Sequence, residues 1–203
     1  MRIDNLTEMQ TDALRECGSI GAGHAATALS QLVGHPIAID VPTLELVGIG
    51  DVPELFGGPE VLVAAVHVRL LGDVGGSMLF MAERSSALAL VDLMHAREVG
   101  SAHSYGADEE ALLTHVASIL MSAYLAAIGR LADVGMLPAR PSSALDMAGA
   151  LMEAVTSAAA LHADVALLLR TRFHDADTSV DAYLFFLPDA EALDLLLGRL
   201  GVA

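Results

Sequence analysis

The order of predicted elements in the first half of the chain recurs in the second half, and this repeat limits the folds open to the sequence. A Ser-Ile pair begins at Ser19 and again at Ser118, and a proline follows each serine 23 residues later, at Pro42 and Pro141. The spacing between the copies is 99 residues in both cases. An internal duplication with pseudo-two-fold symmetry is the simplest explanation.

Each half is predicted to contain a long helix, extended segments and a further helix. Thr7 and Gln10 have the spacing of a capping box, and Gly34 stands where the first helix should stop. Alternating apolar residues and turn signals divide the rest of the chain. The expected helices are 7–33, 85–96, 108–134, 148–161 and 189–200, and the expected strands are 37–47, 61–71, 77–82, 142–147, 165–174 and 179–187, with a turn at 175–178.

We therefore predict a single α/β (α+β) domain over residues 1–203, built from pseudo-symmetric repeats of about 1–100 and 101–203. Two long helices should pack on one side of a mainly antiparallel sheet. Pro42 predicts an edge strand or a bulge, because proline cannot donate a ladder hydrogen bond. Asp189 is predicted to cap the last helix.

Three glycines, Gly18, Gly21 and Gly23, lie inside the first predicted helix. Each costs about 1 kcal/mol of helix stability relative to alanine, so each needs a reason. We expect close packing of the second helix or the docking of a partner. Cys17, beside them, is predicted to be a small buried residue.

The charge of the chain excludes several classes of function. Its formal net charge of -16 argues against nucleic-acid binding and against docking on anionic lipid. The longest apolar run, about Val116–Gly129, is shorter than a membrane span and is followed by Arg130, so we expect no membrane insertion and a cytoplasmic location. Lysine is absent, and 15 Asp outnumber 11 Glu. A GC-rich genome that replaces Lys by Arg is one explanation, and adaptation to high salt is the other, which we state as a hypothesis. A melting temperature that climbs with molar KCl would support that hypothesis.

One face of each long helix carries polar residues at helical spacing. Residues three or four apart share a face, because a helix turns about 100° per residue. The first stripe consists of Asp12, Glu16, Ser19 and Gly23. The same offset of 99 residues gives the second stripe, which consists of Ala111, His115, Ser118 and Ser122. A merely solvated helix face is the alternative explanation of both.

The segment from Glu16 to Ser30 resembles the first helix of the CheC-type chemotaxis phosphatases, the group of CheC, CheX and FliY. That family's signature is Asp or Ser, then Glu, Asn and Pro at fixed spacing. Residues 146–153 also resemble the family's stretch after the proline. The signature positions are held here by Asp12, Glu16, Ser19 and Pro42 in the first copy, and by Ala111, His115, Ser118 and Pro141 in the second.

The resemblance implies a CheC-like fold and a defined chemistry. The substrate would be the aspartyl phosphate of a CheY-like response regulator, which brings its own Mg²⁺, so the chain would need no cofactor or metal of its own. Glu16 would engage the regulator's active-site lysine, and the residue at position 19 would orient the attacking water. A CheD-like protein is a further partner that the resemblance implies.

Serine replaces the family's asparagine in both stripes, at Ser19 and Ser118. Its hydroxyl is about one bond shorter than a carboxamide, and a 100-fold loss of rate corresponds to about 2.7 kcal/mol. We expect a protein that binds the regulator through Glu16 and hydrolyses its phosphate weakly. The alternative is a catalytically inactive adaptor or switch component that binds CheY-like or CheD-like proteins. His115 cannot replace a carboxylate facing a lysine, so the second stripe should be the poorer site.

Other chemistries find little support in the sequence. The glycines of residues 18–23 lie inside a helix and not after a strand, which argues against a nucleotide-binding loop. Ser19 lacks the surroundings of a hydrolase nucleophile. The eight histidines never show the i, i+4 spacing of helical metal ligands. A small-molecule sensor would require an apolar cavity.

Overall fold

Helix α1 (Glu8–Val33) begins and ends where the sequence predicts. The Thr7 side chain accepts a hydrogen bond from the backbone of Gln10, and Gln10 accepts one from the backbone of Thr7 at 2.9 Å, which confirms the capping box. Gly34 adopts the left-handed conformation at φ 77° and donates to the carbonyl of Ser30. Both ends of the helix are therefore set by local residue chemistry.

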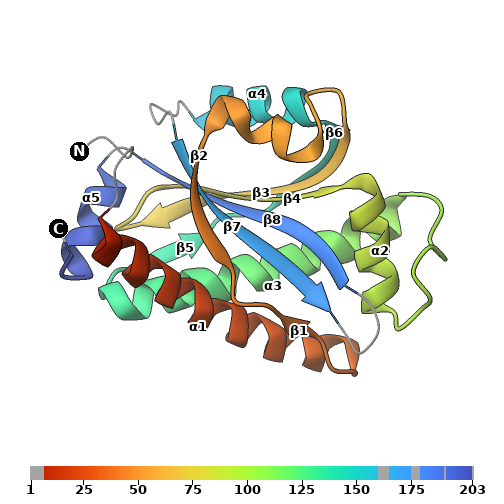
Figure 1. Ribbon diagram of the computed structural model, residues 1–203, viewed down its shortest axis with the longest axis horizontal. Coiled ribbons are helices and arrows are strands. Elements are labelled where there is room, and N and C mark those ends of the chain that lie inside the picture. Colours follow the sequence, from red (N-terminus) through yellow and green to blue (C-terminus); the bar gives the residue numbers. More distant parts are fainter. Residues whose placement is uncertain (1–6, 160–164, 175–178, 190, 203) are drawn as a thin grey trace.

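The computed structural model describes residues 7–159, 165–174, 179–189 and 191–202 (Figure 1). The predicted turn at 175–178, the last residues of the predicted helix 148–161, and His162 lie outside the described residues. The first half contains α1, β1 (Ala38–Ile39), β2 (Thr43–Gly48), the 3₁₀ helix η1 (Ile49–Phe56), β3 (Leu62–Gly72), β4 (Gly76–Glu83) and α2 (Arg84–Met94). The second half contains α3 (Ala107–Ala132), β5 (Met136–Pro138), β6 (Ser142–Met147), α4 (Ala148–Ala159), β7 (Val165–His174), β8 (Ser179–Pro188) and α5 (Ala192–Arg199).

The eight strands that the structure describes form one sheet, and their pairings are antiparallel. The order is β1-β7-β8-β4-β3-β5, with β2 also paired to β7 and β6 also paired to β3. The two halves meet at the centre, where β4 pairs with β8. Each half also places its second strand on the other half's part of the sheet, β2 on β7 and β6 on β3.

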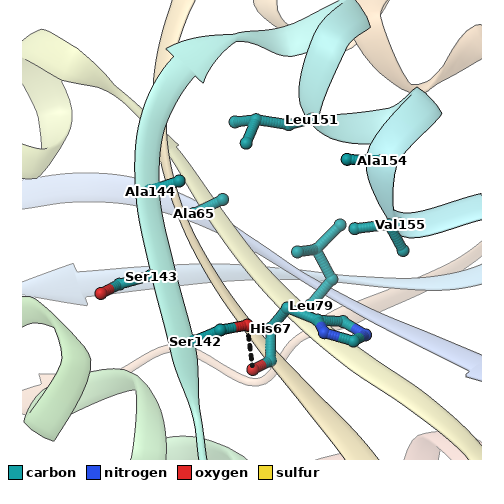
Figure 2. Close-up of a pocket in the computed structure, with 9 residues that line it drawn as sticks. All are labelled: Ala65, His67, Leu79, Ser142, Ser143, Ala144, Leu151, Ala154 and Val155. Carbon is teal, nitrogen blue, oxygen red and sulfur yellow. Dashed lines mark hydrogen bonds between the residues drawn. The ribbon is translucent and has the colours of Figure 1, made fainter. Parts of the chain in front are cut away.

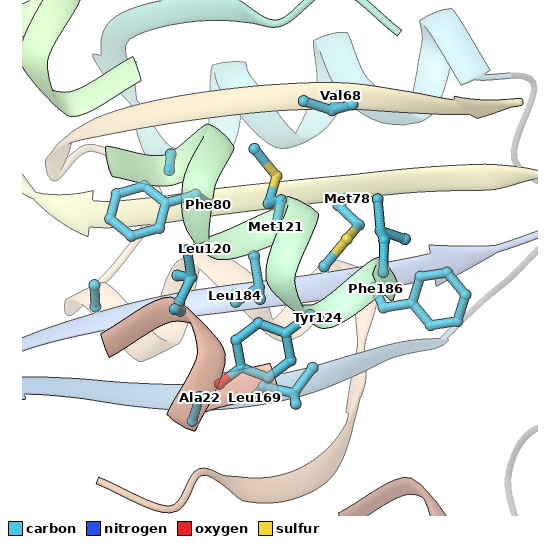
Figure 3. Packing of buried hydrophobic residues seen from close by; sticks show 14 of the residues in the cluster. Ala22, Val68, Met78, Phe80, Leu120, Met121, Tyr124, Leu169, Leu184 and Phe186 are labelled. Carbon is cyan, nitrogen blue, oxygen red and sulfur yellow. The ribbon is translucent and has the colours of Figure 1, made fainter. Parts of the chain in front are cut away.

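Helices cover both faces of the sheet (Figure 1). The long helices α1 and α3, together with α2 and α5, pack on one face, and η1 and α4 pack on the other. Two separate apolar cores result, and Figure 3 shows part of the larger one, where Tyr124 of α3 lies beside Ala22 of α1 and Leu169 of β7. The prediction of two long helices on one side of an antiparallel sheet is confirmed.

The two long helices run antiparallel (Figure 1), and Gly21 of α1 packs against Tyr124 of α3. A Cβ atom on Gly21 would lie 2.9 Å from the Cα of Tyr124 in α3, so a larger residue would force the helices apart. A Cβ on Gly18 would meet the Leu169 side chain at 3.1 Å. The expected close packing of the second helix is therefore confirmed at Gly21, whereas Gly18 packs most closely against β7 and Pro42.

Three local features differ from the sequence-based expectations. The 3₁₀ helix η1 and the short strand β5 were not predicted, because both are brief and depend on tertiary contacts. The N-cap of α5 is Glu191 and not Asp189, since the backbone N–H of Asp189 donates to the carbonyl of Gly75 and continues the sheet pairing. In addition, the predicted strand 37–47 is interrupted, because Pro42 separates β1 from β2. Both short strands pair with β7 at the edge of the sheet, which is where the proline was expected.

Among the described helices, α3 is long and apolar enough to cross a membrane by length and composition. Half of that stretch is buried inside the fold. Its apolar residues Leu113, Leu120 and Tyr124 belong to the larger core. The hydropathy of α3 is therefore that of a helix packed against α1 and the sheet.

Candidate functional site

The first stripe lies on the side of α1 that faces away from the sheet. Asp12, Glu16 and Gly23 are exposed, and Ser19 is half-buried. The opposite side of the helix is buried, and it includes Leu14, Cys17, Gly21 and Ala25. The packing of α1 on α3 and the sheet therefore leaves the polar face free for contact with another molecule.

The two carboxylates of the first stripe differ in their surroundings. Asp12 forms an exposed ion pair with Arg15 at 2.6 Å. Glu16 lies one helical turn after Asp12, and it has no ion pair or hydrogen bond among the described residues. The hydroxyl of Ser19 likewise forms no hydrogen bond within the described part of the chain. The first stripe therefore presents an unpaired carboxylate next to an unpaired hydroxyl.

Two buried residues support the helix beneath this stripe. Cys17 is 1% exposed, and burial raises the pKa of its thiol to about 11. It is therefore a core residue, as predicted, and not a nucleophile. Pro42 is buried, and its Cγ lies 3.2 Å from the place where a Cβ on Gly18 would stand. The proline thus packs against α1 one residue before Ser19, which fixes the helix at the position of the stripe.

The second stripe also faces outward, but its side chains differ. Ala111, His115 and Ser122 are exposed, and Ser118 is half-buried. The hydroxyl of Ser118 donates to the backbone carbonyl of Thr114 at 2.7 Å. Pro141 is half-buried and directly precedes β6. The second stripe therefore offers an imidazole and a hydroxyl that is already engaged within its own helix.

A shallow groove of about 480 Å³ runs between α1 and α3 beside the second stripe. It is lined by His115, Ser118 and Ser122 of α3 and by His24 of α1, above a floor of alanines and Ile119. His24 was not among the predicted site residues. Spacing along one helix gives no sign of it, because the position depends on how the antiparallel pair crosses at Gly21.

A second pocket, of about 270 Å³, lies on the opposite face of the sheet, between α4 and strands β3, β4 and β6 (Figure 2). Its lining is mostly apolar and includes His67, whose backbone carbonyl accepts a hydrogen bond from Ser142 at 3.5 Å. Burial lowers the pKa of His67. Its Nε2 is buried and has no hydrogen-bond partner among the described residues. The pocket could hold a small apolar molecule, but it provides few polar groups that would fix the orientation of that molecule.

Within the ranges that the structure describes, no three His, Cys, Asp or Glu side chains come together as a metal site would require. His174 is half-buried, and its Nε2 lies 3.0 Å from Asp40 Oδ1. A pair of this kind can stabilise the end of a strand but does not provide a set of metal ligands.

Comparisons with known proteins match the region that carries the first stripe and then the whole chain. A model of the CheC-like family matches residues 9–46, which include Asp12, Glu16 and Pro42. The CheY-P phosphatase CheC of Bacillus subtilis is 30% identical over 204 residues, which cover 98% of each chain. The chain belongs to the CheC-like family.

A second curated relative and a solved structure are also similar to the chain. The flagellar motor switch phosphatase FliY of Bacillus subtilis is 35% identical over 92 residues, which are 45% of this CheC-like chain and 24% of FliY. The crystal structure of Thermotoga maritima FliY superimposes with a TM-score of 0.77, covering 97% of this chain and 98% of FliY at 16% identity. That similarity shows that the two proteins share a fold, and it confirms the predicted CheC-like architecture.

Proposed function

We propose that this CheC-like protein binds the phosphorylated form of a CheY-like response regulator through the first stripe and hydrolyses its aspartyl phosphate weakly. The observation that carries the proposal is the unpaired, exposed carboxylate of Glu16 beside the unpaired hydroxyl of Ser19. A carboxylate with no partner among the described residues can form a charge-assisted bond to a lysine of the regulator without first breaking another bond. Such a protein acts in the cytoplasm, where response regulators work.

In this reaction the helix only has to position the attacking water and the regulator's active site relative to each other. The bond between phosphorus and the regulator's aspartyl oxygen breaks, and a water oxygen forms a bond to phosphorus. The aspartate leaves as a carboxylate, and the water's proton passes to an oxygen of the released phosphate. The regulator carries the Mg²⁺ that neutralises the phosphoryl oxygens. Glu16 fixes the helix over the regulator's active site. The Ser19 hydroxyl contacts the water less well than a carboxamide would, so the water is poorly oriented and hydrolysis is slow.

The binding test uses a CheY-like regulator held in its phosphorylated form by beryllofluoride and Mg²⁺. Substitution Glu16→Gln should weaken binding about 30-fold, or about 2 kcal/mol, because the neutral amide loses the charge of the pair. Glu153→Gln is the matched control, since Glu153 is an exposed glutamate on α4, across the sheet from the stripe. Equal affinity of the Glu16→Gln variant and the wild type would overturn the proposal.

A catalytically inactive adaptor is the second candidate, and serine at positions 19 and 118 favours it. The adaptor would bind the regulator, or a CheD-like protein, without release of phosphate. Measuring inorganic phosphate from acetyl-phosphate-loaded regulator, with and without a CheD-like protein, separates the two. Release above the regulator's own rate that is lost in Ser19→Ala supports the weak phosphatase, and binding without such release supports the adaptor.

A further inference from the structure

The three glycines of α1 stand in very different surroundings. Gly18 and Gly21 are buried, and added Cβ atoms there would meet Pro42 at 3.2 Å and Tyr124 at 2.9 Å. Gly23 is exposed, and a Cβ built on it meets nothing within 4 Å. Glycine is the poorest helix former after proline, and alanine would fit at position 23 without strain. No contact among the described residues therefore accounts for a glycine at this position.

A side chain at position 23 would cover the site described above. In an α-helix each Cα–Cβ bond tilts toward the N-terminus, so a side chain lies over the preceding turn. For position 23 that turn holds Ser19, which is half-buried and has an unpaired hydroxyl. The carbonyl of Gly23 accepts a hydrogen bond from the Thr27 hydroxyl at 2.9 Å. The feature left open at Gly23 is therefore a bare stretch of helix backbone next to Ser19.

The second stripe lacks this bare stretch. Its matching position is Ser122, an exposed residue with a side chain. The hydroxyl of Ser118, one turn earlier, is bonded to the carbonyl of Thr114. An uncovered backbone thus occurs beside Glu16 and the free hydroxyl, and not beside His115.

We propose that Gly23 is a docking residue, at which the regulator comes into direct van der Waals contact with the backbone of α1 next to Ser19. This inference rests on the proposed function and adds to it where the partner approaches most closely. A methyl group at position 23 would hold the partner away from Ser19 and Glu16. Glycine is kept there at the expense of helix stability because the contact requires it.

The proposal is tested with the variant Gly23→Ala, using the full chain and the beryllofluoride-activated regulator. The melting temperature should rise by about 2–4 °C, because alanine is the better helix former. The affinity for the regulator should fall about tenfold, as expected when an extra methyl group enters a close-packed contact. Gly23→Leu should bind more weakly still. A loss of binding in a more stable protein cannot be explained by unfolding.

Gly50→Ala is the matched control, because Gly50 in η1 is also exposed, with nothing within 4 Å of an added Cβ. It lies across the sheet from α1, so its affinity for the regulator should equal that of the wild type. If the wild type binds and Gly23→Ala binds equally well, the role of Gly23 is overturned while the proposed function stands. If the wild type itself fails to bind the activated regulator, both are overturned.

Discussion

The first and second stripes occupy equivalent places on two helices of equal length, yet their chemistry differs. Both face outward from the same antiparallel pair, α1 and α3. The first offers an unpaired Glu16 and a free Ser19 hydroxyl, whereas the second offers His115 and a Ser118 hydroxyl that is bonded to its own helix. The backbone pattern is thus retained in both halves while the side chains are not. Packing accounts for the buried faces of both helices, and it does not account for the difference between their outer faces.

Restoring the missing carboxamide should separate the two stripes most clearly. Ser19→Asn should raise phosphate release from the regulator about 100-fold, because the water is then held by a planar donor and acceptor. Ser118→Asn should leave the rate unchanged, since His115 provides no carboxylate beside it. Discontinuous assays of inorganic phosphate, quenched at successive times, measure both rates. Equal gains in the two variants would show that the stripes are equivalent.

A bulky side chain between α1 and α3 should destabilise the packing that supports both stripes. Gly21→Val places a branched side chain where a Cβ already lies 2.9 Å from the Tyr124 backbone. The free energy of unfolding should fall by about 2 kcal/mol, measured by urea denaturation. Gly23→Val, on the open side of the same helix, should cause no such loss. Destabilisation by Gly23→Val as well would mean that the outer face of α1 is also packed.

Rebuilding the second stripe should convert it into a binding site. The triple variant Ala111→Asp, His115→Glu and Ser118→Asn recreates the family's signature before Pro141. We expect the number of activated regulators bound per chain to increase from one to two, with the new site about tenfold weaker (~1.4 kcal/mol) because Ser122 covers the turn that Gly23 leaves bare. Titration calorimetry gives the stoichiometry. A stoichiometry that stays at one regulator per chain would show that these three side chains are not sufficient for binding.

The two serines should respond differently to truncation, and this is the smallest effect. Ser118→Ala removes a hydrogen bond to the Thr114 carbonyl but gains helix propensity, so the free energy of unfolding should change by about 0.5 kcal/mol or less. Ser19→Ala has no such bond to lose, and it should stabilise the protein by a few tenths of a kcal/mol. Differential scanning calorimetry on both variants tests the contrast. Destabilisation by Ser19→Ala would reveal that its hydroxyl is bonded.

Local signals were sufficient to predict most of the fold. The capping box of Thr7 and Gln10 and the stop at Gly34 fixed α1, and the prediction for strand 142–147 agrees with β6 at both ends. The segments that escaped prediction depend on contacts between distant residues. β5 is three residues long and exists because it pairs with the end of β3. Asp189 looked like a cap from its neighbours, but its backbone is held by Gly75.

The candidate site was only partly predictable for the same reason. Helical spacing placed Asp12, Glu16 and Ser19 on one face, and the structure describes that face as outward. Spacing could not separate the bonded Ser118 hydroxyl from the free one at Ser19. It also could not bring His24 of α1 into the groove beside Ser118, since that requires knowing how the two helices cross.

The exchange of strands between the halves has a consequence for the history of such a chain. Because β6 lies against β3 and β2 lies against β7, neither half could be deleted without stripping a partner from the other. Under the hypothesis of an internal duplication, this exchange makes both copies necessary to the sheet. The outer face of α3 could then lose the signature without loss of the fold, while the outer face of α1 kept Asp12 and Glu16.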